Sequence, residues 1–393
     1  MNRDKDFYGF YTWIFATLVL PYLPVVLPFV PSRFAGFNLT GWSWILMFMV
    51  CIYYFFKKPV SYFPFKYWMP WIVYLFGYLF FEASFFGIQI SLQYVLPVFV
   101  GIVASRFRYG KEEFYWLFKR LMVIAFLMFG MFTLDYFLED FRTAHWAPSS
   151  IFVTIPAAVL VGLYFMTKKI KFLLFYGALF LIPFLNVTRM ALLVFVVIFI
   201  AHFANYNVFS KVLYAALGVL MLLGIFYSDE FQRKTFYGGE GEITDLSINY
   251  YEDNTVVNTS GRRGFYRHFE RGLRESPVWG NGPRADYYVM HSFSGLNDAH
   301  NDYLSVRYNY GYVGLALLLY AFGGSFLSVY KRYRYYKRKK EAYAVLIAST
   351  TLVLFFAFMM FMYTDNILKY TIFFPNMFFA MIGMVFSKSW VDS

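Results

Sequence analysis

Long apolar runs constrain what this chain can fold into more than any other feature of its sequence. A helix needs about 20 mostly apolar residues to cross the hydrocarbon core of a bilayer. Twelve runs approach or exceed this length, and they cover residues 8–30, 41–56, 67–81, 88–104, 119–137, 149–167, 171–186, 189–205, 211–227, 304–330, 343–363 and 370–386. Because a helix satisfies its own backbone polar groups in lipid, we expect an all-α integral membrane protein with about twelve transmembrane helices.

The composition excludes a soluble globule. Of the 393 residues, 60% are hydrophobic and only 15% are charged, against about 25% charged residues in an ordinary soluble domain. The net charge of +12 does not indicate a nucleic-acid partner, because the basic residues lie in short clusters between apolar runs and not on one soluble face. The single cysteine, Cys51, excludes a disulfide framework and a cysteine-rich metal site. We expect no metal and no other cofactor.

The basic residues predict the orientation in the membrane. Lysine and arginine in short loops are enriched on the cytoplasmic side. If the N-terminus is cytoplasmic, the inner segments contain 22 of these residues and the short outer segments contain five. This alternation requires a tight hairpin at residues 186–189 between the seventh and eighth runs. We therefore expect both termini in the cytoplasm.

One segment is long enough to form a lobe outside the membrane. Residues 228–300 contain 73 residues without a long apolar run, and the alternation places them on the outer face. The sequence thus predicts three parts: residues 1–227 with nine transmembrane helices, residues 228–303 as an outer lobe, and residues 304–393 with the last three helices.

The lobe contains an amphipathic helix predicted from Arg262 to Ser276. Its apolar and basic side chains recur at four-residue steps on separate faces. The apolar positions are Phe265, Phe269 and Leu273, and the basic positions are Arg263, Arg267 and Arg271. One interpretation is an interfacial helix whose arginines reach lipid headgroups. The other is that at least one guanidinium binds a phosphate or pyrophosphate bidentately.

Two further residues are candidates for chemistry at the outer face. Arg189 interrupts an apolar stretch near the predicted outer headgroup level, where a charge is costly and usually functional; the alternative is an arginine that reaches the headgroups from a helix end. His300 stands between Asp298 and Asp302, and neighbouring carboxylates can tune a histidine as a proton acceptor. The other four histidines are expected to be ordinary hydrogen-bonded residues.

Four short motifs follow one another through the central and C-terminal half. The first three are Thr188-Arg189-Met190-Ala191, then Ser260-Gly261-Arg262, then the turn Ser276-Pro277-Val278-Trp279-Gly280-Asn281-Gly282-Pro283. The fourth is His300-Asn301, nine further residues, then Gly311 and Gly314. In order, spacing and outer placement, these motifs resemble those of the O-antigen ligase and O-antigen polymerase superfamily of bacterial inner-membrane glycosyltransferases, over roughly residues 185–320.

This resemblance implies a fold, a donor and a location. The fold would be the GT-C type, and the donor would be a glycan linked through pyrophosphate to undecaprenol. The reaction would occur at the outer, periplasmic face of the inner membrane, without a metal and with inversion at the anomeric carbon. The expectation of a metal-free reaction agrees with residues 31–40 in the first outer loop, which contain no acidic residue that could hold a metal.

The resemblance also implies roles for individual residues. Arg189 and Arg262 would stabilise the leaving pyrophosphate, and His300 would accept the proton of the acceptor hydroxyl. Arg263 is an equally placed candidate for the family arginine beside Arg262. Further contacts with the substrates are expected from five residues in or near the motifs, namely Arg263, Arg267, Trp279, Arg284 and Asn301.

Two acceptors and two other classes of protein stay open at this point. A ligase passes the glycan to the lipid A core, whereas a polymerase passes it to another lipid-linked repeat unit, and one sequence does not separate these. A lipid-linked oligosaccharide flippase or exporter would also have about twelve helices, but it would need polar residues along a central path, and most of the runs here are nearly free of charge. A catalytically inactive binding homologue is the remaining alternative.

Overall fold

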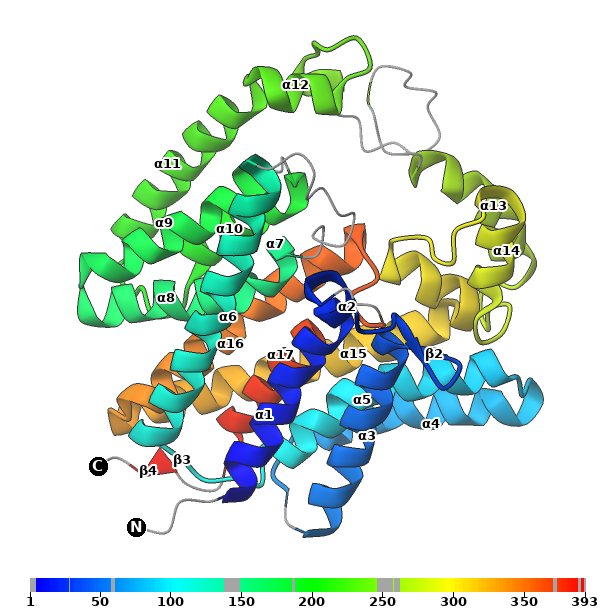
Figure 1. Cartoon of the computed structure of the whole chain (residues 1–393), viewed down its shortest axis with the longest axis horizontal. Helices are drawn as coiled ribbons and strands as arrows, with labels where there is room; N and C mark the ends of the chain where they lie inside the picture. Colours follow the sequence, from blue (N-terminus) through cyan, green and yellow to red (C-terminus); the bar gives the residue numbers. More distant parts are fainter. Residues whose placement is uncertain are drawn as a thin grey trace.

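The computed structural model of the chain is helical almost throughout (Figure 1). It describes residues 5–27, 29–57, 61–137, 149–185, 188–245, 257, 262–369, 373–387 and 390–391. The helices are α1 (Lys5–Val19), α2 (Leu23–Val26), α3 (Leu39–Lys57), α4 (Phe65–Phe81), α5 (Phe85–Ala104), α6 (Lys111–Phe137), α7 (Ser149–Phe152), α8 (Thr154–Thr167), α9 (Ile170–Leu185), α10 (Arg189–Ala201), α11 (Val208–Phe226), α12 (Asp229–Thr235), α13 (Arg262–Glu275), α14 (Ala285–Ser294), α15 (Asp302–Lys339), α16 (Ala342–Thr364) and α17 (Phe373–Val385), with 3₁₀ turns η1 (Leu20–Tyr22) and η4 (Ile243–Asp245).

Four two-residue strands form two small ladders. Strand β1 (Arg33–Phe34) pairs antiparallel with β2 (Phe37–Asn38) before α3. Strand β3 (Tyr109–Gly110) pairs parallel with β4 (Trp390–Val391), which ties the C-terminal end of the chain to the start of α6. Neither ladder was expected from the sequence, because such short pairs leave no periodic pattern.

An all-α membrane protein is confirmed at the level of its helices. Each of the twelve apolar runs contains a helix, and within the described residues seven helical segments are long and apolar enough to cross a membrane. These are Leu39–Lys57, Phe85–Ala104, Lys111–Thr133, Ser150–Thr167, Val208–Phe226, Asp302–Lys339 and Ala342–Thr364. Helices α9, α10 and α17 are apolar but shorter. Twelve crossings and a GT-C arrangement stay predictions.

The centre of the molecule is formed by α5, α15, α16 and α17. Helix α16 is buried along most of its length, and every residue of α17 is buried. Gly101 of α5 and Gly383 of α17 face each other, and a Cβ on Gly101 would lie 2.9 Å from the carbonyl of Phe379. Small residues at this crossing therefore let the two backbones touch, which is typical of helix packing in membranes.

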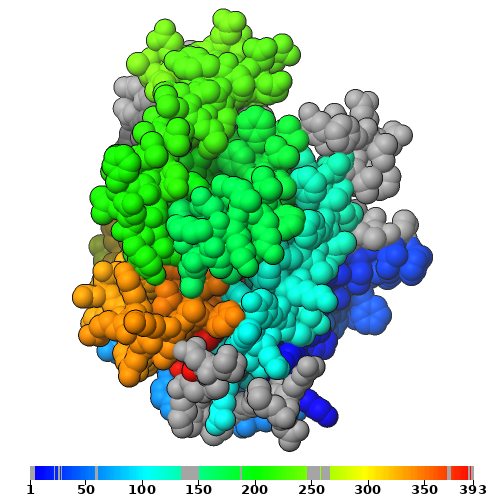
Figure 2. All heavy atoms as spheres, turned by 90° about the vertical axis from the view of Figure 1, so that its left-hand side faces the viewer, coloured from blue at the N-terminus to red at the C-terminus, as the bar shows by residue number. Residues whose placement is uncertain are grey.

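Helix α11 presents an apolar surface to its surroundings. Its exposed side chains include Val208, Phe209, Val212, Leu217 and Leu220, with Phe209 as much as 76% accessible. Figure 2 shows the green helices α8 to α12 over the upper part of this face of the molecule. So large an apolar surface is expected where the helix contacts lipid.

The two ends of the helical body differ. Figure 1 shows the N- and C-termini together at one end, with the C-terminal residues of α15 and the start of α6. The segments α12, α13 and α14 lie away from this end. The termini and the lobe are therefore on opposite ends of the body, as the alternation of charged loops predicts; the side of the membrane on which each lies stays a prediction.

Candidate active site

The turn at residues 276–283 and the Gly-x-x-Gly motif form one structural unit. Four backbone hydrogen bonds join the turn to the middle of α15, from Asn281 N to Tyr308 O (2.9 Å), Gly282 N to Asn309 O (3.0 Å), Tyr312 N to Pro277 O (2.9 Å) and Val313 N to Val278 O (3.2 Å). These bonds satisfy backbone groups of α15 at the point where its own helical hydrogen bonds are interrupted. Two motifs that are separated in the sequence are thus joined in the structure, because each provides hydrogen-bond partners for the other.

Gly311 makes this interruption of α15 possible. Its backbone has φ 64° and ψ −169°, a non-helical conformation inside the helix. This region of φ and ψ is open essentially only to glycine, and a Cβ at this position would collide with the carbonyl of Val278. The first glycine of the signature is therefore required by the backbone. Gly314 lies against the ring of Tyr74 and the indole of Trp71.

A buried group of four charged side chains connects the lobe to the helical body. This group, here called the ionic cluster, consists of Arg284, Asp286, Asp298 and Lys369. Arg284 Nη1 lies 2.6 Å from Asp298 Oδ1, Lys369 Nζ lies 3.2 Å from Asp286 Oδ2, and Lys369 also pairs closely with Asp298. Asn309 Nδ2 donates to Asp286 Oδ1 over 2.9 Å. The cluster joins α14, the loop before α15 and the turn after α16.

The charges of the ionic cluster stabilise one another. Burial alone would raise the pKa of Asp286, but the charges of Lys369 and then Arg284, with the hydrogen bond from Asn309, leave the pKa below its ordinary value. Burial would lower the pKa of Arg284, but Asp286 and Asp298 hold it above its ordinary value. Because two cations face two carboxylates, the cluster has little net charge to offer a substrate.

His300 lies at the edge of the same region with its ring accessible. Its backbone is left-handed (φ 49°), and its side chain is 41% exposed. The ring Nδ1 is 3.4 Å from Oδ1 of Asp365, a long contact that can shorten when a substrate binds. A carboxylate that accepts a hydrogen bond from Nδ1–H favours the tautomer in which Nε2 is free to accept a proton. Asp365 thus supplies the carboxylate partner that a histidine base needs.

Asp365 and Lys369 of the ionic cluster belong to one turn. Asp365 follows α16 at residue 364, and Lys369 lies four residues later, anchored to Asp286 and Asp298. The backbone N–H of Leu368 in this turn donates to Asp302 Oδ2 over 3.0 Å. The cluster therefore fixes the turn that holds Asp365 beside His300. Asp298 and Asp302, which flank His300 in the sequence, are buried and occupied in this anchoring.

Arg189 is the first residue of α10 and is half-buried. It has a basic neighbour, Lys234 near the end of α12. Desolvation and then the positive charge of Arg189 lower the pKa of Lys234. The sequence singled out Arg189 but gave no signal for Lys234, because the two are brought together only by the fold.

The amphipathic helix of the lobe is confirmed as α13. Phe269 and Leu273 are buried against Met290, Ala299 and Tyr308. The apolar face therefore covers the core of the lobe, which does not support the interpretation that this face lies in lipid. Arg271 and Arg274 pair with Glu275 and Glu270 along the outer face. Arg262 and Arg263 begin this helix. Their side chains lie outside the described residues, so the choice between them as the family arginine stays a prediction.

The remaining residues predicted to contact substrate have different surroundings. Arg267 and Trp279 are exposed, and Trp279 is 62% accessible beside the junction with α15. Asn301 caps α15, with its Oδ1 accepting from Leu304 N over 3.0 Å. Arg284 is occupied in the ionic cluster. The structure thus brings His300, Asn301 and Arg284 into one region at the start of α15 and gives two of these side chains a structural partner.

No group of three or more His, Cys, Asp or Glu side chains is arranged to hold a metal ion within the part of the chain that the structure describes. The polar groups that are present near His300 instead pair with one another. Among the described residues, His300 therefore has a carboxylate partner in Asp365, and Arg189 has a basic neighbour in Lys234.

Comparison with known families agrees with the motifs. Residues 173–319 match the family model described as O-antigen ligase. The match includes Arg189, Arg262, the turn at 276–283, His300 and both motif glycines. No curated protein matches the chain. The match over residues 173–319 supports the O-antigen ligase and O-antigen polymerase superfamily that the motifs resemble.

Proposed function

We propose that this protein transfers a glycan from an undecaprenyl-pyrophosphate carrier to a sugar hydroxyl during the assembly of O-antigen, lipopolysaccharide or capsule. The family match supports an enzyme of polysaccharide assembly in a bacterial inner membrane. The observation that carries the reaction is the pairing of His300 with Asp365, which prepares a proton acceptor inside the matched segment.

The reaction that we propose is a single displacement. The acceptor oxygen bonds to the anomeric carbon, and the bond from that carbon to the pyrophosphate oxygen breaks with inversion. The hydroxyl proton passes to Nε2 of His300, while Asp365 stabilises the resulting imidazolium. Arg189, with Arg262 or Arg263, stabilises the charge that develops on the leaving pyrophosphate. In this scheme the arginines supply the positive charge that a metal ion provides in other glycosyltransferases.

The same site serves a ligase or a polymerase. The acceptor is the lipid A core in the first case and a lipid-linked repeat unit in the second.

We propose that residues 228–303 form a lobe on the periplasmic face, between helices in 1–227 and 304–393, with both termini in the cytoplasm. The position of the termini and of α12 to α14 at opposite ends of the body supports this arrangement (Figure 1).

The role of His300 is tested by separating donor binding from transfer. Purified protein in nanodiscs is given lipid-linked glycan and acceptor, and both bound donor and product are measured. His300→Ala should retain donor binding and lose transfer, because a base acts on the reaction step and contributes little to holding pyrophosphate. His291→Ala is the matched control, since His291 is exposed on α14 and should leave both unchanged. A well-folded His300→Ala protein with normal turnover would place the base elsewhere.

A further inference from the structure

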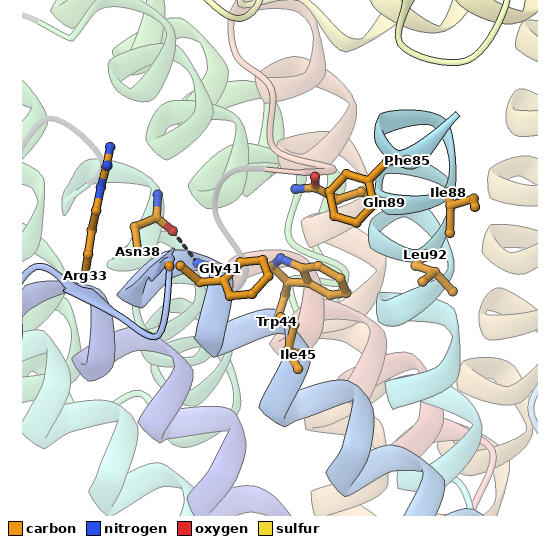
Figure 3. Close-up of a pocket in the computed structure, with 11 residues that line it drawn as sticks. Arg33, Asn38, Gly41, Trp44, Ile45, Phe85, Ile88, Gln89 and Leu92 are labelled. Atoms are coloured by element: carbon orange, nitrogen blue, oxygen red, sulfur yellow. Dashed lines mark hydrogen bonds between the residues drawn. The ribbon is translucent and has the colours of Figure 1, made fainter. Parts of the chain in front are cut away.

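A cavity lies between the first outer hairpin, α3 and α5, outside the segment that matches the family. It has a volume of about 470 Å³, within the range of small-molecule sites of about 300–1,000 Å³. Figure 3 shows Trp44 on α3, Phe85 and Gln89 on α5, and Arg33 and Asn38 of the hairpin around this space. The cavity is therefore open to ligands at the end where α3 and α5 begin.

The walls of this cavity are preformed. The hairpin turns through Ala35 and Gly36, both with positive φ, as a tight two-residue β-turn requires. The indole N–H of Trp42 donates to Phe34 O over 2.7 Å, and the backbone N–H of Gly41 donates to Asn38 Oδ1 over 2.6 Å. The hairpin is thus fixed to the first turns of α3, so a ligand would find its polar groups already in place.

Three polar groups around the cavity have no partner among the residues that the structure describes. Among the described residues, the guanidinium of Arg33, the indole N–H of Trp44 and the amide of Gln89 make no hydrogen bond or ion pair. They stand beside the aromatic rings of Phe37, Trp44 and Phe85. A flat apolar surface edged by donors and amides suits a sugar ring, which has apolar C–H faces and hydroxyl groups at its rim. A lipid chain would use the aromatic walls and none of these polar groups.

A second, much smaller cavity of about 10 Å³ lies on Trp44 and on residues of the ionic cluster region. Trp44 lines both cavities, and the smaller one also contacts Gln93, Asn376 and Lys369 of the ionic cluster. Both amide atoms of Asn376 are fully buried without a partner among the described residues. Such groups are costly when unpaired. A ligand hydroxyl or an ordered water in the smaller cavity would satisfy them.

Helix α5, which lines the outer cavity, also contacts the lobe. Phe86, next to Phe85, stacks on Tyr287 of α14 at 5.6 Å, and a Cβ on Gly87 would lie 3.0 Å from Pro283. The cavity is therefore lined by a helix that also contacts the lobe, and the smaller cavity reaches Lys369 of the ionic cluster.

We propose that this cavity is a saccharide-binding subsite, in which a sugar ring stacks on Trp44 and Phe85 and is hydrogen-bonded by Gln89 and Arg33. This inference rests on the proposed function, under which the sugar belongs either to the acceptor or to the glycan of the lipid-linked donor. Arg33 and the absence of a carboxylate from the residues lining the cavity favour a sugar with an acidic substituent.

The subsite is tested first by binding, which does not depend on turnover. The probe is oligosaccharide released by mild acid from the surface polysaccharide of the source organism, observed by saturation-transfer NMR with protein in nanodiscs. Wild-type protein should give a signal that Gln89→Leu and Trp44→Leu weaken. Trp13→Leu is the matched control, because Trp13 is also partly exposed but lies on α1 away from the cavity, and it should bind as wild type.

The second arm measures transfer and identifies the source of the sugar. Gln89→Leu removes one hydrogen-bonding group at nearly constant volume, so the KM of one substrate should rise about tenfold while kcat changes less than twofold. A higher KM for the acceptor identifies an acceptor subsite, and a higher KM for the donor identifies a donor subsite.

Two outcomes separate the subsite from the proposed function. The subsite would be overturned, and the function left intact, if folded Gln89→Leu and Trp44→Leu proteins had unchanged binding and KM. The same would follow if native mass spectrometry showed a phospholipid in the cavity that does not compete with sugar. Sugar binding that depends on Gln89 without any transfer from lipid-linked donor would overturn the function and support the subsite.

Discussion

Lys369 is a buried cation of the ionic cluster. Its ammonium is almost fully buried between Asp286 and Asp298. Lys369→Met should destabilise the protein by about 3–5 kcal/mol, because it leaves buried carboxylates with half of their positive charge. Thermal unfolding in detergent measures this change. Lys331→Met, at an exposed lysine of α15, should have little effect, and an equally small effect of Lys369→Met would show that the cluster is not a structural anchor.

The lowered pKa of Asp286 predicts how stability depends on pH. A carboxyl group with a lowered folded pKa contributes stability that is complete above its ordinary pKa of about 3.9 and is lost as the pH falls through the folded value. For Asp286 this loss occurs below about pH 4. The melting temperature of wild-type protein should therefore fall in this acid range, and Asp286→Asn should be less stable near neutral pH but show a shallower fall. Parallel curves for the two proteins would contradict this account.

Arg189 is expected to act on the transition state. Arg189→Ala should lower the transfer rate about a hundredfold, the usual cost of losing one charge-stabilising group, without removing the protein from the membrane. Arg189→Lys should restore little, since a point charge does not replace a bidentate guanidinium. Product formation at fixed protein level measures both. A wild-type rate in the alanine variant would exclude Arg189 from the site.

Two single variants distinguish which of the lobe arginines, Arg262 or Arg263, is needed for transfer. We expect Arg262→Ala to abolish transfer and Arg263→Ala to retain it, because Arg262 ends the Ser-Gly-Arg motif. The two variants have the same change of charge and neighbouring positions on α13, so each is the control of the other. The reverse result would assign the role to Arg263.

The sequence predicted only part of the candidate site. His300 was identified because carboxylates flank it in the chain, and Arg189 because it interrupts an apolar run. Asp365 and Lys369 gave no comparable signal, because each meets its partner across more than 60 residues of sequence. The flanking carboxylates Asp298 and Asp302 proved to be buried in anchoring contacts, which proximity in sequence does not distinguish from a role in proton transfer.

At the scale of single elements, the interrupted helix α15 determines how the lobe is held. Gly311→Ala should destabilise the protein by at least about 1–3 kcal/mol, the cost of a non-glycine residue in this backbone conformation, with a further cost from the collision with Val278. Gly323→Ala is the matched control in the same helix, because nothing lies within 4 Å of its added Cβ and alanine is the better helix former. Equal melting temperatures for the two variants would show that the kink is not required.

The sequence predicted the elements better than their interruptions. Apolar runs of about 20 residues indicate helices because lipid requires internal hydrogen bonding, and every run contains one. The break at Gly311 was not predicted, since a glycine in an apolar run also fits close helix packing. The β1–β2 hairpin likewise depends on positive φ at Ala35 and on the Trp42 hydrogen bond, neither of which leaves a periodic pattern.

At the scale of the whole molecule, the orientation in the membrane can be tested by cysteine labelling. In a Cys51→Ser background, Ser294→Cys in the lobe should react with an impermeant reagent added to spheroplasts. Lys339→Cys at the other end of the body should react only after the membrane is opened. Both positions are exposed in the structure, so burial does not limit their reaction. Labelling of Lys339→Cys from outside would invert the topology and remove the lobe from the periplasmic face.

The central claim is that the glycan comes directly from a lipid-linked pyrophosphate donor. The most direct measurement supplies purified wild-type protein in nanodiscs with undecaprenyl-pyrophosphate-linked glycan and a saccharide acceptor, without nucleotide sugar and with excess EDTA. The account predicts an elongated or glycan-bearing acceptor and free undecaprenyl pyrophosphate in equal amounts, lost in His300→Ala. A requirement for nucleotide sugar or for a metal ion, or movement of intact donor across a liposome membrane without any new glycosidic bond, would contradict it.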